Sequence, residues 1–187
     1  GQVYETRARG NFRHTKVDPI VGDNVEFKFE EKTLGYIEKV YPRKNMLTRP
    51  KVANVDMALV VVPVMDPKYN LMTIDKTIIQ AEDQDIDVAI VINKCDLDRK
   101  ESEKLANIYK NSGFKTFMIS NKDNSIEDLR DYIRGKTVAL CGVSGAGKST
   151  ITSRILDKDV EVGKVSDKTR RGKHTTRHTE ISVSYTH

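Results

Sequence analysis

Tryptophan is absent from the 187-residue sequence, and cysteine occurs only twice, as Cys95 and Cys141. Two distant cysteines cannot supply the four ligands of a structural zinc site, nor the cysteine framework of a disulfide-stapled secreted domain. The sequence also lacks a signal peptide and any apolar run near the roughly 20 residues that span a bilayer. We therefore expect a cytoplasmic protein with free thiols that does not act at a membrane.

A glycine-rich loop lies between an expected buried strand, residues 136–141, and an expected helix. Gly142, Gly147, Lys148 and Ser149 fit the pattern G-x-x-x-x-G-K-[ST], which is typical of phosphate loops. Glycines bring several backbone N–H groups close to a polyphosphate, and the helix N-terminus adds its positive end. Lys148 can reach the β and γ phosphates, and the Ser149 hydroxyl can ligate Mg²⁺. A chance glycine-rich turn is the alternative, but the strand–loop–helix context favours a nucleotide site. The predicted nucleotide-binding residues here are Gly142, Val143, Ser144, Gly145, Ala146, Gly147, Lys148, Ser149 and Thr150, with Lys148 also catalytic.

Residues 1–50 read as about five short strands with turn signals, which is typical of a small OB-type β-barrel. The last of these strands is expected at residues 44–48. Aromatic residues interleaved with basic ones would suit RNA binding by stacking, although each ring is more often expected to fill the barrel core. These aromatic residues are Tyr4, Phe12, Phe27, Phe29, Tyr36 and Tyr41.

Residues 51–187 alternate buried strands with helices, which predicts an α/β domain with a mostly parallel, doubly wound sheet. Strands are expected at residues 56–62, 88–92, 115–119 and 136–141. Helices are expected at residues 71–82, at 99–112 and from a Ser125 cap to Ile133. In such a sheet, ligand-binding loops gather at the carboxyl ends of the strands.

The second of these strands ends at the tetrapeptide Asn93-Lys94-Cys95-Asp96. The Asp96 carboxylate can accept hydrogen bonds from N1–H and the exocyclic amine of guanine, whereas adenine offers no such donor pair. Asn93 can tie the loops together, and the Lys94 stem can cover one face of the base. A surface turn of the same sequence is the alternative. The predicted base-binding residues are Asn93, Lys94, Cys95, Asp96, Ser120 and Asn121, the last two through backbone N–H.

The guanine loop precedes the phosphate loop, which reverses the order found in Ras-like proteins and indicates a circular permutation. Together with the preceding barrel, the chain closely resembles the RsgA (YjeQ/YloQ) family of bacterial ribosome small subunit-dependent GTPases. The resemblance covers the whole chain. It rests on residues 10–27, 93–96 and 142–149 and on the basic stretch that ends at His174-Thr175-Thr176.

The resemblance implies a first switch segment within residues 163–180. Thr175, or alternatively Thr176, is expected to ligate Mg²⁺ and sense the γ-phosphate, and His174 is expected to position the attacking water. The alternative is a basic loop that only contacts RNA through residues such as Arg170, Arg171 and Lys173. The family also has an Asp-x-Pro-Gly segment and a zinc-binding domain, neither of which this sequence contains. We therefore expect the chain to be part of a longer protein, with Zn²⁺ bound only in that further domain.

The formal net charge is +5, and both ends of the chain are basic: residues 1–51 hold 11 Lys and Arg against 7 Asp and Glu, and residues 163–187 hold 6 against 2. This distribution favours a polyanionic partner. The resemblance identifies that partner as the small ribosomal subunit and its rRNA, with no role for DNA, and we expect a monomeric GTP hydrolase of late subunit assembly. Two alternatives are a nucleotide-gated RNA-binding module without turnover and an ATP-dependent, kinase-like enzyme.

Overall fold

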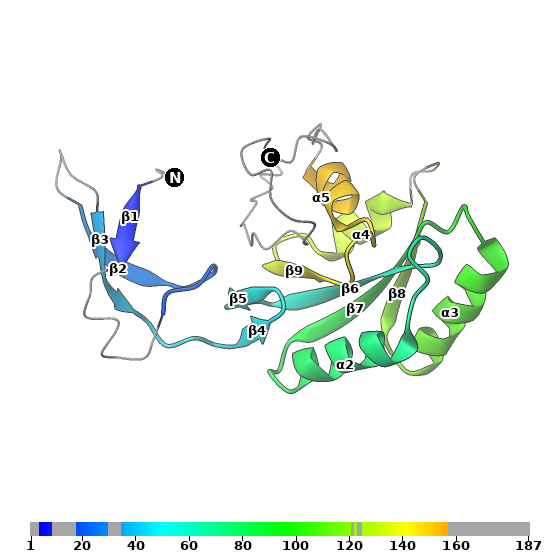
Figure 1. Cartoon of the computed structure of the whole chain (residues 1–187), viewed down its shortest axis with the longest axis horizontal. Helices are drawn as coiled ribbons and strands as arrows, with labels where there is room; N and C mark the ends of the chain where they lie inside the picture. Colours follow the sequence, from blue (N-terminus) through cyan, green and yellow to red (C-terminus); the bar gives the residue numbers. More distant parts are fainter. Residues whose placement is uncertain (1–3, 9–17, 30–34, 121, 123–124, 157–187) are drawn as a thin grey trace, which may run out of the picture.

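The computed structural model describes residues 4–8, 18–29, 35–120, 122 and 125–156 (Figure 1). A small N-terminal sheet lies to one side of a larger α/β domain, and a short hairpin lies between them. Within the described residues, no helix is both long and apolar enough to cross a membrane.

The α/β domain contains a four-stranded sheet whose strands are all parallel, in the order β8-β7-β6-β9. The strands are β6 (Met57–Pro63), β7 (Asp87–Asn93), β8 (Lys115–Ile119) and β9 (Val138–Cys141). The prediction of a parallel α/β sheet is therefore confirmed, and each predicted strand is present within two residues of its expected bounds.

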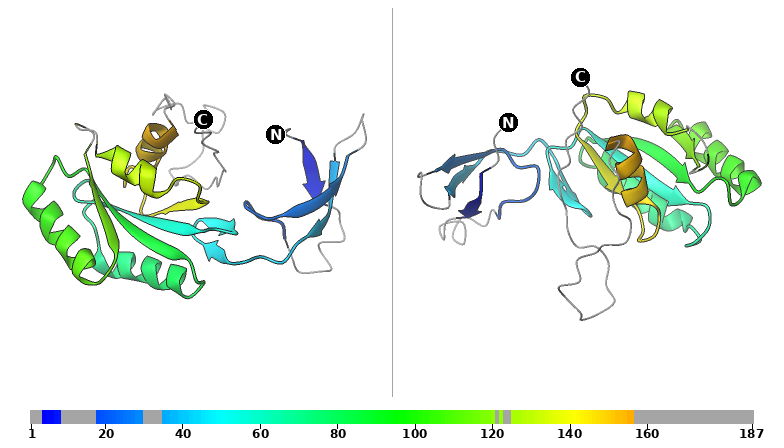
Figure 2. Two further views of the ribbon diagram at one scale, coloured as in Figure 1. Left: turned by 180° about the vertical axis from the view of Figure 1, so that it is seen from behind. Right: turned by 90° about the horizontal axis from the view of Figure 1, so that it is seen from above.

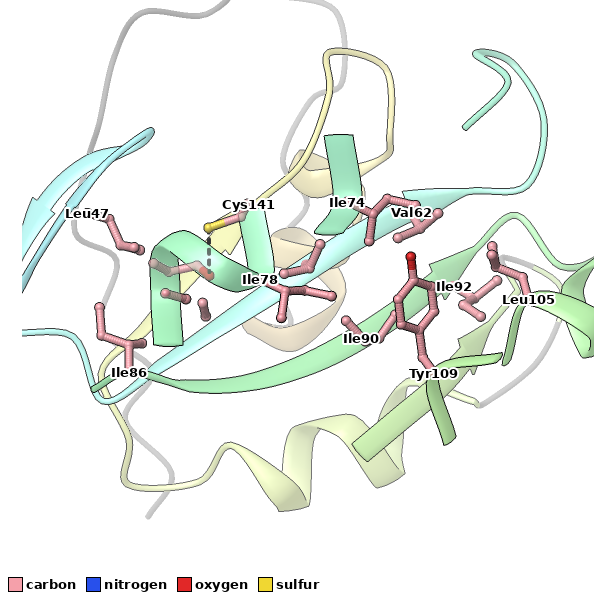
Figure 3. Packing of buried hydrophobic residues seen from close by; sticks show 14 of the residues in the cluster. Leu47, Val62, Ile74, Ile78, Ile86, Ile90, Ile92, Leu105, Tyr109 and Cys141 are labelled. Carbon is pink, nitrogen blue, oxygen red and sulfur yellow. Dashed lines mark hydrogen bonds between the residues drawn. The ribbon is translucent and has the colours of Figure 1, made fainter. Parts of the chain in front are cut away.

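Helices cover both faces of this sheet (Figure 2). α2 (Leu71–Glu82) and α3 (Arg99–Asn111) pack on one face, and α4 (Ile126–Tyr132) and α5 (Lys148–Leu156) cover the other. Because the strands alternate their side chains between the two faces, β6 contributes to both layers of the core. Val62 lies with Ile74 and Ile78 of α2 (Figure 3). Val60 belongs to the same cluster. Leu59 lies with the α4 and α5 residues.

Side-chain caps fix the starts of α2 and α3. The Asn70 side chain accepts a hydrogen bond from Thr73 N, and the Asp98 side chain accepts one from Glu101 N. The prediction that the Ser125 side chain caps α4 by a hydrogen bond is wrong. Ser125 does occupy the N-cap position of α4, but its side chain makes no capping hydrogen bond; its hydroxyl accepts the N–H of Ser120 at 3.0 Å. That hydroxyl therefore holds the loop at the end of β8.

The N-terminal sheet has three strands in the order β1-β3-β2. They are β1 (Thr6–Ala8), β2 (Val25–Lys28) and β3 (Gly35–Val40), with β1 parallel and β2 antiparallel to β3. Residues 9–17 and 30–34 lie outside the described part of the chain, so the closed OB-type barrel stays a prediction.

The strand expected at residues 44–48 is present as a shorter strand, and its membership of a closed barrel stays a prediction. β4 (Met46–Thr48) pairs with β5 (Lys51–Ala53), a strand that the sequence pattern did not predict, in a separate two-stranded sheet. Leu47 and Val52 are buried in the core of the α/β domain, so apolar packing draws this hairpin to that domain. The predicted domain boundary at residues 50–51 falls in its turn.

The preceding segment is held firmly against this hairpin. Val21 forms a bridge with Val52, and a Cβ on Gly22 would lie 2.1 Å from the carbonyl oxygen of Ala53. The Asp23 carboxylate accepts hydrogen bonds from Arg43 Nε at 2.7 Å and Nη2 at 2.9 Å. This joint connects the N-terminal sheet to the α/β domain.

The expectation that individual N-terminal aromatic rings fill a core is wrong for the five that the structure describes. Tyr4, Phe27, Phe29, Tyr36 and Tyr41 are all at least 37% exposed. Tyr4 packs against Phe27 and Phe29, with ring centroids 5.3 and 5.1 Å apart, so these rings cover one another at the surface. Phe12 lies outside the described residues.

Candidate nucleotide site

The two predicted nucleotide loops meet at the carboxyl ends of the central strands. Asn93 ends β7 and is 1% exposed, and its Nδ2 donates a hydrogen bond to the carbonyl of Ala146 in the phosphate loop at 2.8 Å. This bond joins residues 53 positions apart in the chain. The Asn93 Oδ1 is buried and has no hydrogen-bond partner in the described part of the chain, so this junction has an unused hydrogen-bond acceptor.

The phosphate loop has a backbone that only glycine fits at two positions. Gly142 has φ +138°, and a Cβ there would lie 2.4 Å from the Val61 carbonyl oxygen. Gly147 has φ +95°, and its Cβ would lie 2.1 Å from Asn93 Nδ2. Helix α5 begins directly afterwards at Lys148. The loop and helix end together have the backbone geometry that is typical of phosphate loops.

Lys148 is held within this loop. Its Nζ donates to the carbonyls of Gly142 at 2.9 Å and Val143 at 2.8 Å. Burial lowers the pKa of Lys148. Burial also raises the pKa of the adjacent Cys141 thiol to about 11, which keeps that thiol neutral at pH 7. Lys148 therefore supplies the positive charge of the loop, and Cys141 is a packed, unreactive neighbour.

Asp96 lies at the predicted base-binding end, and its side chain is 18% exposed. Its carboxylate is 3.4 Å from Lys122 Nζ and 3.4 Å from Ser120 Oγ. Desolvation raises the pKa of Asp96, but its hydrogen bonds and the charge of Lys122 outweigh that effect and lower the pKa overall. Asp96 is thus an ionised acceptor that can receive the two donors of a guanine edge.

The rest of the tetrapeptide holds this carboxylate in place. Cys95 N donates to the Ile119 carbonyl at 3.1 Å, which ties the guanine loop to the end of β8. Lys94 has a left-handed backbone, φ +62°, and its ammonium donates to the carbonyl of Asp66. Its side chain therefore bridges the guanine loop and the segment after β6.

Several predicted site residues lie outside the described residues, so their roles stay predictions: Asn121, His174, Thr175 and Thr176. Within the described part of the chain, Ser144 and Ser149 are exposed and Thr150 is half-buried. No group of three or more His, Cys, Asp or Glu residues that could hold a metal ion occurs among the residues that the structure places.

Comparison with protein families agrees with this geometry. The model of the RsgA GTPase matches residues 40–185, and the model of the RsgA N-terminal domain matches residues 1–37. The chain belongs to the RsgA GTPase family. An RsgA-family assignment accounts for both the order of the motifs and the N-terminal sheet, as the sequence resemblance predicted.

Relatives with the same architecture support this assignment. The small ribosomal subunit biogenesis GTPase RsgA 2 of Listeria monocytogenes is 42% identical over 186 residues, which cover 97% of this chain and 64% of that protein. The RsgA of Alkaliphilus metalliredigens is 43% identical over 185 residues, or 96% of this chain and 63% of the relative. The chain therefore spans somewhat less than two thirds of the length of these RsgA proteins.

Solved structures of the family show the same fold. The crystal structure of YjeQ from Thermotoga maritima matches with a TM-score of 0.67 at 38% identity, covering 80% of this chain and 55% of that one. YloQ, described as a circularly permuted GTPase, matches with a TM-score of 0.62 at 34% identity, covering 80% and 54%. The predicted permutation is confirmed by this likeness.

The motif patterns of this RsgA-family chain did not identify every residue at the site. Lys122 pairs with Asp96, and the carbonyl of Asp66 receives Lys94. The place of Lys122 directly after Ser120-Asn121 was a usable signal. The role of the Asp66 carbonyl depends on tertiary packing, and no sequence pattern could have predicted it.

Proposed function

We propose that the protein containing this chain binds GTP and GDP and hydrolyses GTP to GDP and phosphate. The observation that carries the proposal is the Asn93–Ala146 hydrogen bond, which joins the predicted guanine loop to the phosphate loop. The ionised Asp96 belongs to the same guanine loop. One nucleotide carries both base and phosphates, so the loops that bind these two parts must lie next to each other. The same arrangement argues against a kinase-like ATP enzyme, since adenine cannot satisfy the Asp96 carboxylate.

The chain's own residues suggest how the reaction is supported. Guanine donates its N1–H and amine to Asp96, while Lys148 and the loop N–H groups stabilise the charge that develops on the phosphates. Ser149, with Thr175 or Thr176, would hold Mg²⁺, which neutralises phosphate charge when bound. His174 would position the attacking water.

We further propose that the partner is the small ribosomal subunit, through its rRNA. The relatives are named small ribosomal subunit biogenesis GTPases. The exposed cluster of Tyr4, Phe27 and Phe29 offers faces on which unpaired bases can stack. The protein would act as a monomer in the cytoplasm, during late subunit assembly, and without a DNA target. Zn²⁺ would belong to a further domain such as the family contains.

Single-turnover hydrolysis by the complete gene product, with and without purified small subunits, tests this function. We expect small subunits to stimulate phosphate release, and Lys148→Ala to abolish that stimulation because it removes the charge at the phosphates. Lys110→Ala in the last turn of α3 is the matched control and should leave the rate unchanged. Tight GTP binding without subunit-stimulated release would instead support a nucleotide-gated RNA-binding module.

A further inference from the structure

The β6–α2 segment, residues 64–70, lies beside the predicted guanine loop. Its first residue, Val64, donates its N–H to the Asn93 carbonyl at 3.1 Å. Two residues later, the Asp66 carbonyl accepts a hydrogen bond from the Lys94 ammonium. Asn93 and Lys94 are the first two residues of the guanine loop, so the backbone of this segment binds the loop at two adjacent positions.

The same segment also lies beside the phosphate loop. A Cβ on Gly145 would lie 3.3 Å from Pro67 Cδ, so the segment packs closely against that loop. Residues 65–68 are exposed, so burial contributes little to fixing this stretch. The position of the Asp66 carbonyl, which accepts the Lys94 ammonium, therefore depends on the hydrogen bonds at the two ends of the segment.

Tyr69 makes the hydrogen bond at the far end. Its hydroxyl donates to Glu101 Oε1 at 2.5 Å, and Glu101 lies in the first turn of α3. This helix begins just after the guanine loop, where the Asp98 carboxylate accepts the Glu101 N–H at 2.9 Å. The bond between the two side chains raises the pKa of Tyr69 to about 12 and lowers the pKa of Glu101, so donor and acceptor keep these states at pH 7. Tyr69 thus anchors the segment to the helix that follows the guanine loop.

The Lys94 side chain connects this anchor to the nucleotide. A lysine stem can lie along an apolar surface, as predicted for Lys94 and the base, when its charged head has a polar partner. That partner is the Asp66 carbonyl, three residues before Tyr69. We propose that Tyr69 is a positioning residue for guanine-nucleotide binding, acting through the Asp66 carbonyl to hold the Lys94 side chain. The inference rests on the proposed guanine-nucleotide function.

Calorimetric titration of the complete gene product with GDP tests this role in a double-mutant cycle. Tyr69→Phe removes only the hydroxyl, and we expect the dissociation constant for GDP to rise about fivefold, since part of the lost hydrogen-bond energy reaches the ligand. Lys94→Met keeps an apolar stem but removes the ammonium, and it should weaken GDP binding to a similar extent. Because Tyr69 acts through that ammonium, Tyr69→Phe should change the affinity by less than about 1.5-fold when Lys94→Met is already present.

Tyr109→Phe is the matched control. Tyr109, in the C-terminal half of α3, donates its hydroxyl to the Asp75 carboxylate of α2 at 3.0 Å. The control therefore removes the same kind of bond, and it should lower the temperature of unfolding while the GDP affinity stays unchanged. Glu101→Met removes the acceptor of Tyr69 from the other side and should reproduce the fivefold loss.

Unchanged GDP affinity in Tyr69→Phe, or an equal loss in Tyr109→Phe, would overturn the proposal. A fivefold loss that persists in full beside Lys94→Met would also overturn it, because the hydroxyl would then act without the ammonium. If circular dichroism shows that Tyr69→Phe is unfolded, Glu101→Met decides by the same criteria. Failure of the unaltered protein to bind GDP would instead refute the proposed function itself.

Discussion

At the scale of single residues, the closest fit in the site is between Gly147 and Asn93. The Gly147 backbone has φ +95° and leaves no room for a Cβ beside the Asn93 amide. The same amide binds the Ala146 carbonyl, so the two nucleotide loops are in direct contact. A methyl group at this one position would push apart the two predicted nucleotide loops.

Gly147→Ala should therefore weaken GDP binding by about tenfold or more, because the Cβ displaces the Asn93 amide and the backbone is strained by about 1–2 kcal/mol. Fluorescence titration with a labelled GDP, together with thermal unfolding, measures both effects. Gly113→Ala is a matched control, with φ +90° and no atom within 4 Å of its Cβ. It should lose similar stability and keep its GDP affinity. Equal GDP affinity in the two variants would contradict the account of the loop contact.

At this scale, the motifs predicted the residues whose chemistry is fixed by type and spacing, such as Lys148 and Asp96. They did not predict partners that depend on how elements pack. Ser125 was expected to cap α4, but the end of β8 lies close enough for its hydroxyl to accept the Ser120 N–H instead. Such choices are settled by tertiary distance, which one sequence does not contain.

At the scale of elements, the β4–β5 hairpin and its joint with residues 20–23 connect the N-terminal sheet to the α/β domain. The Asp23 side chain is 2% exposed and paired with Arg43, which is 23% exposed. Burial raises the pKa of Asp23, but the Arg43 hydrogen bond and the Ile20 N–H outweigh it and lower the pKa below the ordinary value of 3.8. The ionised pair therefore stabilises the joint.

Removing the Asp23 charge should lower the free energy of unfolding at pH 7. We expect Asp23→Asn to cost about 3 kcal/mol, because it leaves Arg43 without its charged partner. Since the folded pKa of Asp23 is lowered, its contribution is complete above pH 3.8 and is lost as pH falls through the folded value. Urea unfolding from pH 7 to pH 3 should show a steeper loss in the unaltered chain than in the variant.

Glu103→Gln is the control for this prediction. Glu103 pairs with Arg99 at 2.8 Å, but both side chains are more than half exposed. Such a pair contributes less than about 1 kcal/mol, so the variant should unfold almost as the unaltered chain does. A similar loss of stability in both variants would mean that the joint gains nothing from burying its ion pair.

Elements with strong periodic patterns were the most predictable. Helix α2 lies at its predicted bounds, because buried Ile74, Ile78 and Ala81 recur at helical spacing. Strand β5 has three residues next to Pro50 and has no pattern of its own. Val52 of this strand is buried among core residues of the α/β domain, a tertiary contact that the local sequence does not contain.

At the scale of the whole molecule, the parallel sheet places the guanine loop and the phosphate loop close together, although their order along the chain is reversed. β6 lies between β7 and β9, so the guanine loop and the phosphate loop end up at one edge of the sheet. The order of the motifs and the spacing of the strands sufficed to predict this assembly. The form of the N-terminal domain was less predictable, because short strands around turns do not specify which of them pair.

The central claim is that this site selects guanine through Asp96, and competition binding of diphosphate nucleotides tests it directly. Asp96→Asn exchanges an acceptor for a donor, so we predict that GDP affinity falls about 100-fold while xanthosine diphosphate becomes the preferred ligand. Asp98→Asn is the control, since asparagine also caps a helix well and the Asp98 side chain accepts the Glu101 N–H at the start of α3. It should bind GDP normally, with ADP competing poorly throughout. An unchanged base preference in Asp96→Asn would contradict the assignment of the guanine loop.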